Sequence, residues 1–120
     1  MVAIGFKDSG IEIDLQGIEK FIAIKSKLFI PYEHIESVND NADEVKRYLR
    51  VGGTAIGYSH SLFGRFTTNE GLGFFVVRDK KKAFAINLVN EPYKVIVLEL
   101  DNNEDAISKL RERIKSDGAK

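Results

Sequence analysis

The sequence contains no cysteine, no tryptophan and only two prolines among its 120 residues. Without cysteine, the chain cannot form disulfides, use a thiolate nucleophile or bind zinc through sulfur ligands. An oxidising compartment is therefore not required, and a reducing cytoplasm is the expected location. Long hydrophobic runs are also missing: residues 72–77 and 95–98 are the longest, far below the ~20 residues that a membrane-spanning helix needs.

An excess of charge of either sign is missing as well. Lys plus Arg and Asp plus Glu number 18 each, so the formal net charge is zero. A neutral chain has no global field that would gather nucleic acid or anionic lipid, so no nucleic-acid partner is predicted. The length fits a single domain over residues 1–120, with a core made by about residues 2–115 and a frayed tail at 116–120.

What the sequence does contain is a series of short alternating apolar and polar segments separated by turn residues, the pattern of antiparallel strands. The predicted strands are residues 2–7, 11–15, 27–30, 35–38, 45–51, 72–78, 83–88 and 93–100. The last three are expected to follow one another as a meander. Residues 17–24 leave helix and strand both open, because their apolar residues fit either spacing.

The last predicted element is an amphipathic helix over residues 102–115. Asn102 is a suitable N-cap, with Asp105 three residues later. One apolar stripe follows, and we expect it to plug one end of a barrel. Its members are Ala106, Ile107, Leu110 and Ile114.

Several short motifs make the prediction of the fold more specific. They are Ile-Pro-Tyr-Glu-His-Ile at 30–35, Arg-Val-Gly-Gly-Thr at 50–54, Gly-Arg-Phe at 64–66, Phe-Phe-Val-Val at 74–77 and Glu-Pro-Tyr at 91–93. Their order and spacing over about residues 11–115 resemble the bacterial pleckstrin-homology-like (PH-like) domains of unknown function. The resemblance implies a mainly β fold, a PH-like barrel of about seven antiparallel strands capped by one C-terminal α-helix. It also implies a binding or assembly module rather than an enzyme. The sequence departs from the family where a proline is expected near Gly52 and near Tyr58.

The glycine-rich segment 52–64 and its flanks supply the candidate ligand-binding residues, which are Arg50, Gly53, Thr54, His60 and Arg65. Glycines allow backbone N–H groups to approach a phosphate closely. However, no Gly-Lys-Ser/Thr or Gly-x-Gly-x-x-Gly motif is present, so a structural loop is the favoured interpretation.

Catalytic and metal chemistry are not predicted. His60 lies beside Ser59 and Ser61, but adjacent residues of an extended chain point apart, so no nucleophile and base pair is expected there. His34 and His60 lack the spacing of a metal motif, and His34 is interpreted as a surface or half-buried structural residue. No cofactor is predicted.

One basic cluster contains Arg78, Lys80, Lys81 and Lys82. It supports an alternative function, a membrane-surface module that contacts anionic lipid through the hairpin tip at 80–82. A solvated tip whose lysines discourage aggregation is the favoured interpretation. Residues 7–12, the first hairpin turn, are nearly neutral, so phosphoinositide binding is not predicted.

Self-association is predicted from the two most hydrophobic strands. Residues 74–77 and 93–100 carry apolar side chains on both faces. One helix with a narrow apolar stripe is not expected to cover both faces, so a homo-oligomer built partly from these strands is expected. The predicted partner is therefore a second copy of the chain or another protein.

Overall fold

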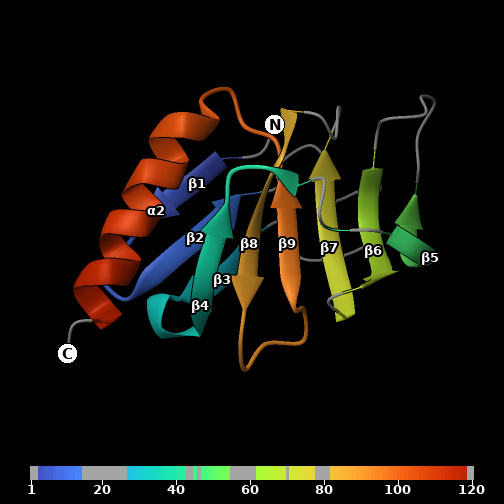
Figure 1. Ribbon diagram of the computed structural model, residues 1–120, viewed down its shortest axis with the longest axis horizontal. Helices are drawn as coiled ribbons and strands as arrows, with labels where there is room; N and C mark the ends of the chain where they lie inside the picture. Colours follow the sequence, from blue (N-terminus) through green and yellow to red (C-terminus); the bar gives the residue numbers. More distant parts are fainter. Residues whose placement is uncertain are drawn as a thin grey trace.

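The computed structural model describes residues 3–14, 27–42, 45, 47–54, 62–69, 71–77 and 82–118. In these residues the fold is mainly β with one C-terminal helix, as predicted (Figure 1). The elements are β1 (Ala3–Phe6), β2 (Gly10–Asp14), β3 (Lys27–Pro31), the 3-10 turn η1 (Tyr32–His34), β4 (Ile35–Asn39), β5 (Arg47–Thr54), β6 (Leu62–Thr68), β7 (Gly71–Val77), β8 (Phe84–Leu88), β9 (Val95–Leu98) and α2 (Asn103–Gly118). Residues 17–24, which the sequence left open, lie outside the described residues.

The first three strands form an antiparallel sheet in the order β1-β2-β3, which confirms the predicted first hairpin. Ile11 and Ile13 of β2 point into the core and are completely buried. On the other face Phe29 is 47% exposed, the one large apolar side chain so exposed among the described residues. Its ring lies over Gly10 of the neighbouring strand, so cross-strand packing accounts for its position.

The remaining strands form a second sheet in the order β4-β8-β9-β7-β6-β5. The predicted meander is wrong, because β9 lies between β8 and β7 and runs parallel to β7, with Gly73 opposite Val95. The reason is the composition of β9, whose four residues are all apolar and all buried. Such a strand is stable only where both faces and both edges are covered, which is the centre of a sheet.

The two sheets do not close into the predicted barrel, and the described residues contain nine strands rather than about seven. The chain leaves the first sheet at Pro31, whose ring cannot donate to a ladder. The 3-10 turn that follows leads the chain into the second sheet. Tyr32 holds this turn against the first hairpin by donating from Oη to the carbonyl oxygen of Lys7 at 2.8 Å. Consecutive strands β3 and β4 therefore belong to different sheets.

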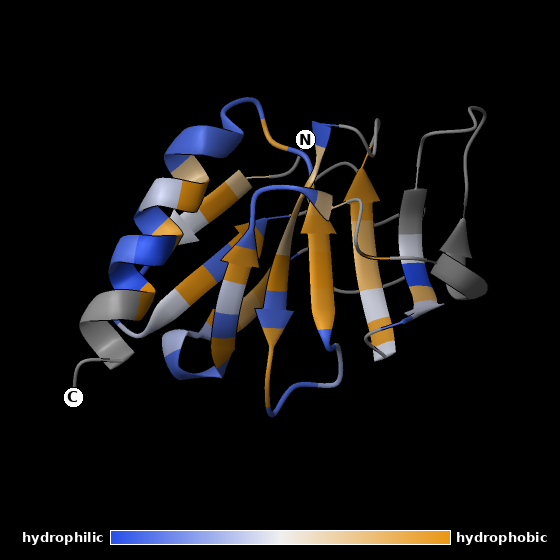
Figure 2. Ribbon diagram, viewed as in Figure 1, coloured by the Kyte–Doolittle hydropathy of each residue, from blue (hydrophilic) through white to orange (hydrophobic). Residues whose placement is uncertain are grey.

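The centre of the second sheet, where β7 and β9 lie, is buried on both faces. One face packs against the three-stranded sheet and α2, and the other forms a separate cluster that includes Ala42 and Val45 from the segment after β4. Adjacent residues Phe74 and Phe75 of β7 point to opposite faces, and both are completely buried. The apolar faces on which self-association was predicted are therefore covered within one chain, and that reason for an oligomer is wrong. Figure 2 shows this hydrophobic centre in β7, β8 and β9.

Helix α2 begins where the sequence predicts. The Oδ1 atom of Asn102 accepts the N–H of Asp105 at 3.1 Å, which confirms the N-cap. Ala106, Ile107 and Leu110 are buried in the cluster between the sheets. The helix packs along β4 and η1 rather than plugging the end of a barrel, and it continues to Gly118, beyond the predicted end at 115.

The burial of Leu110 gives a first testable prediction. Leu110→Ala removes a completely buried side chain that joins α2 to both sheets, and it should lower the free energy of unfolding by ~2–5 kcal/mol. The neighbouring exposed Ser108→Ala should change it by less than about 0.5 kcal/mol. Urea unfolding followed by circular dichroism measures both. Equal stability of the two variants would contradict the packing of this helix.

The close approach at Gly10 gives a second prediction. A Cβ atom there would overlap the carbonyl oxygen of Ile30 and lie 2.8 Å from Cα of Pro31, so Gly10→Ala should destabilise the protein by about 1–3 kcal/mol. Gly5, on the adjacent strand, has room for a Cβ at ordinary contact distances of 3.8–3.9 Å. Gly5→Ala is the matched control and should leave the midpoint of thermal unfolding nearly unchanged. A larger loss in the control than at Gly10 would contradict the register of β2 and β3.

Candidate functional site

Four of the five predicted ligand-binding residues lie on one hairpin. Arg50, Gly53 and Thr54 belong to β5 and Arg65 belongs to β6. The two strands are antiparallel, with Gly53 opposite Gly64 and Thr54 opposite Phe63. The structure therefore brings these residues together, whereas His60 lies outside the described residues.

The segment 52–64 is not a loop over its whole length, and this corrects the sequence interpretation. Strand β5 continues through both glycines to Thr54, and β6 begins at Leu62. Gly64 has a φ of 131°, a backbone conformation that favours glycine, and it occurs inside a strand pair. The glycines thus shape a paired hairpin, and residues 55–61 between its strands lie outside the described residues.

Strand β5 is the last strand of the six-stranded sheet. In the described part of the chain, only β6 pairs with it. Its pairing with β6 shifts register between Arg47 and Arg50 and again between Arg50 and Gly52. Gly52 and Gly53 have no side chains that could shield the backbone, and glycine in a strand often marks a position that another backbone approaches. In Figure 1, β5 lies at the end of the sheet remote from α2.

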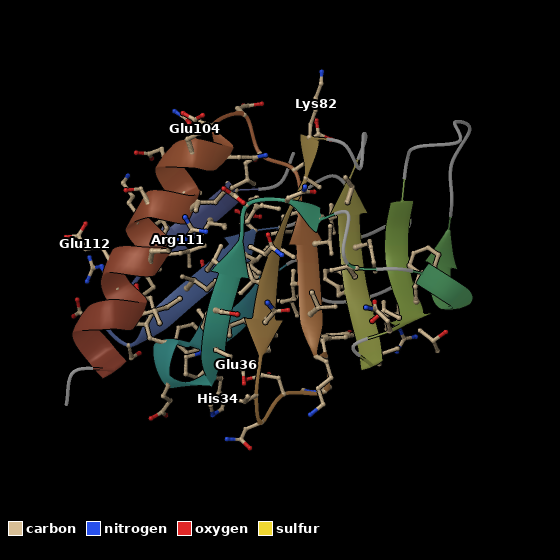
Figure 3. The ribbon with its side chains drawn as sticks, viewed as in Figure 1. His34, Glu36, Lys82, Glu104, Arg111 and Glu112 are labelled. Carbon is tan, nitrogen blue, oxygen red and sulfur yellow. The ribbon has the colours of Figure 1, made fainter. Side chains whose placement is uncertain are left out.

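The opposite edge of the same sheet is covered. Strand β4 packs along α2, and Nη2 of Arg111 donates a hydrogen bond to the carbonyl oxygen of Val38 at 3.1 Å. Figure 3 shows Arg111 on the side of α2 that faces β4. Sequence reasoning missed this contact, because no local pattern relates a helix arginine to a strand carbonyl 73 residues away. The two edges of the sheet therefore differ: β4 is capped by a helix and β5 is not capped by any described element.

Charge is distributed unevenly along the sheet. Strands β5, β6 and β7 contain three arginines, Arg47, Arg50 and Arg65, and no Asp or Glu. In the sequence, residues 45–80 hold six basic and two acidic residues, which leaves twelve basic and sixteen acidic residues elsewhere. A neutral protein thus carries a basic region around β5 and β6, which whole-chain composition does not reveal.

His34 has a structural role in the described residues. Its Nδ1 atom lies 2.6 Å from Oε2 of Glu91, and the side chains are 26% and 16% exposed. The carbonyl oxygen of His34 also accepts the N–H of Val89 at 2.8 Å. Asn90 has a left-handed φ of 57°, which asparagine tolerates, and this confirms the predicted turn after β8. The half-buried, structural interpretation of His34 is therefore confirmed.

The described end of the predicted basic cluster is surrounded by acidic residues. Arg78, Lys80 and Lys81 lie outside the described residues. Lys82 is exposed at the rim of an open cleft of about 460 Å³. The other residues that line the cleft are Glu99, Leu100, Asp101, Asn102, Asn103 and Glu104. Figure 3 labels Lys82 and Glu104 at this end of the molecule.

One more groove, of about 370 Å³, lies between the helix and the first hairpin and was not found from the sequence. Phe6, Lys109, Glu112 and Arg113 line it. Nζ of Lys109 is 5.8 Å from the centre of the Phe6 ring and 3.1 Å from Oδ2 of Asp105. Since its charges are of both signs and partly paired, the groove favours no single class of ligand.

Two features are absent from the described residues. No group of three or more His, Asp or Glu residues among them is arranged to hold a metal ion. None of the helices they form combines the length and the apolar composition needed to cross a bilayer.

The chain was also compared with known proteins. No family model matches it, and neither the curated proteins nor the solved structures contain a significant match.

The cover over the β4 edge gives a third prediction. Arg111→Met keeps the length of the side chain but removes the donor to Val38, and it should lower the free energy of unfolding by about 1 kcal/mol. Backbone amides of β4 should then exchange faster in hydrogen–deuterium exchange mass spectrometry. Glu112→Gln, on the adjacent position of the same helix, is the control and should leave β4 exchange unchanged. Unchanged exchange in Arg111→Met would show that the arginine does not protect this edge.

Proposed function

We propose that this protein is a non-catalytic, PH-like binding or assembly module that takes up an extended segment of another polypeptide at the β5 edge. The observation that carries the proposal is the contrast between the two edges of one sheet. The helix and Arg111 cover β4, whereas β5 has no described strand or helix on its outer side and contains two adjacent glycines. An uncovered strand edge presents N–H and C=O groups to a further strand.

The PH-like part of the proposal is supported by the kinds and order of the secondary-structure elements. A mainly β chain ends in one helix whose apolar stripe enters the core, as the family resemblance implies. In this proposal the module works in a reducing cytoplasm, consistent with its lack of cysteine.

The partner in this proposal is a second copy of the chain or a different protein. Self-association can no longer rest on the apolar faces of β7 and β9, because both are buried in one chain. The β5 edge is one described route by which two copies could join, and pairing across a two-fold axis would extend the sheet.

The proposal is tested on the full chain by hydrogen–deuterium exchange with a panel of soluble eight-residue peptides, which match the length of β5. At least one peptide, or a second copy at high micromolar concentration, should slow exchange over residues 47–54 and leave β4 unaffected. Light scattering in parallel reports any mass above the 13.5 kDa of the monomer. A strict monomer whose β5 is protected by none of the peptides would refute the function.

The alternative of a membrane-surface module gives a fourth prediction. Lys82 lies beside Glu99, Asp101 and Glu104, and these carboxylates would be repelled by an anionic bilayer. We expect no preference for phosphoinositide-containing liposomes over neutral ones in sedimentation at physiological salt. Salt-sensitive sedimentation that disappears in a Lys80→Glu, Lys81→Glu double variant would establish membrane contact instead.

A further inference from the structure

The three-stranded sheet also has an outer strand, β3, at which a further strand could pair. In the described part of the chain, only β2 pairs with β3. The other outer strand of this sheet, β1, has the helix beside it, because Phe6 of β1 and three side chains of α2 line one groove. The β3 edge is therefore separate from the β5 edge, which belongs to the other sheet.

The hydrogen-bond pattern shows which main-chain groups of β3 face its outer edge. The N–H of Tyr32 donates to the carbonyl oxygen of Ser9 at 3.1 Å, so these two residues form a hydrogen-bonded pair just beyond the end of the strand. Pairs alternate in an antiparallel ladder, so the next pair, Gly10 with Pro31, is of the kind without mutual hydrogen bonds. Pro31 has no N–H, and it occupies a position at which the ladder with β2 needs no donor.

Lys27 and Phe29 share the alternation of Pro31. Their N–H and C=O groups point away from β2, and no described strand pairs with β3 on that side. Their side chains lie on the outer face of the sheet, where Phe29 is 47% exposed and the side chain of Lys27 is 52% exposed. Leu28 and Ile30 have the opposite alternation and pack toward the core. The edge thus combines unpaired main-chain groups with an exposed aromatic ring.

We infer that β3 pairs with β3 of a second copy of the chain, antiparallel about a two-fold axis that passes beside Phe29. The two Phe29 residues lie opposite each other, and each donates its N–H to the carbonyl oxygen of the other. Lys27 lies opposite Pro31 of the partner, whose carbonyl oxygen accepts the lysine N–H. Leu28 lies opposite Ile30 of the partner, so apolar side chains meet on the core side, and an aromatic pair forms on the outer side.

The residues at the two ends of the strand favour this register over its neighbours. An axis at Lys27 would place two lysines directly opposite each other, and like charges on paired strands are destabilising. An axis at Pro31 would place two residues without an N–H opposite each other. Axes at Leu28 or Ile30 would each leave part of the five-residue strand beyond the pairing. Only the axis at Phe29 pairs all of β3 with all of β3.

A second copy fits this edge better than other strands do. Pairing of β3 with β5 of another copy would be head-to-tail, and it would leave further edges that add copies without closing. Pairing of β3 with itself closes after two chains, the form that symmetric assemblies most often take. The strand also supplies its own complement, because its sequence places an aromatic residue opposite Phe29 and an apolar residue opposite Leu28.

The first experiment measures the mass of the full chain by analytical ultracentrifugation over a range of concentrations. The average mass should rise from 13.5 kDa toward that of two chains. A five-residue edge buries less area than a standard interface, so we expect a dissociation constant on the order of 100 µM. Phe29→Lys removes the aromatic pair and brings two cations together, and it should raise this constant at least about tenfold.

Two controls isolate the effect of charge at this edge. Ala3→Lys adds the same exposed charge to the same face at the other outer strand, β1, and it should leave the dissociation constant unchanged. In Phe29→Lys, raising the salt to about 300 mM should restore part of the association, because salt screens exposed charges. Circular dichroism of both variants checks that the fold is intact.

The second experiment tests the register by cross-linking. The chain contains no cysteine, so a single introduced cysteine forms disulfides only between copies. Phe29→Cys places two Cα atoms about 5.5 Å apart across the axis, within the range of a disulfide, and should cross-link under mild oxidation. Lys27→Cys is the matched control on the same strand. Its two copies lie four residues apart along the strands, roughly 13 Å, and should not cross-link.

Hydrogen–deuterium exchange of the unmodified chain identifies the edge without any substitution. As the protein concentration rises, exchange over residues 27–31 should slow, while exchange over residues 47–54 should stay the same. Slowing at 47–54 instead would identify β5 as the contact between copies and overturn the inference. A monomer at all concentrations up to about 1 mM would overturn it as well, because this exceeds the expected dissociation constant about tenfold. Neither result at β3 bears on the uptake of peptides at β5, which is measured separately.

Cross-linking decides between the remaining geometries. Equal cross-linking of Phe29→Cys and Lys27→Cys would show that the strands do not pair about Phe29, and it would overturn the register. Growth into assemblies larger than two chains would show head-to-tail pairing and overturn the two-fold dimer.

Discussion

The burial of β9 on both faces is the constraint on which the rest of the fold depends. Val95–Leu98 contains four apolar residues and none is accessible to solvent. Such a strand needs a hydrogen-bonded neighbour on each side and a packed layer above and below. β8 and β7 supply the neighbours, the three-stranded sheet and α2 supply one layer, and the cluster around Ala42 and Val45 lies on the other face.

This arrangement also decides which surfaces are left for function. With β9 at the centre, β4 and β5 become the two edges of the sheet. The helix must bury Ile107 and Leu110 between the sheets, and in doing so it lies along β4, where Arg111 reaches the carbonyl of Val38. The β5 end of the sheet is remote from α2, so the helix does not cover the edge of β5 (Figure 1). The proposed binding edge is therefore a consequence of core packing rather than of a local motif.

The candidate site was predictable as a set of residues but not as a surface. Glycines and arginines near residues 50–65 mark an unusual segment, and the structure places Arg50, Gly53, Thr54 and Arg65 on one hairpin. Their position at a sheet edge could not be read from the sequence, because edge or centre depends on which strands pair. The basic cluster was also visible in the sequence, but its acidic surroundings were not. Lys82 lies among carboxylates that are 17–22 residues away along the chain.

By itself, the sequence determined the elements whose signals are local. Side-chain alternation identified most strands, Pro31 ended β3, and the Asn102 cap with its apolar stripe located α2. Only the tertiary structure decided the order of the strands, the separation into two sheets and the covering of both faces of β7 and β9. These depend on contacts between distant residues, and a period of two shows which side chains share a face but not what covers that face.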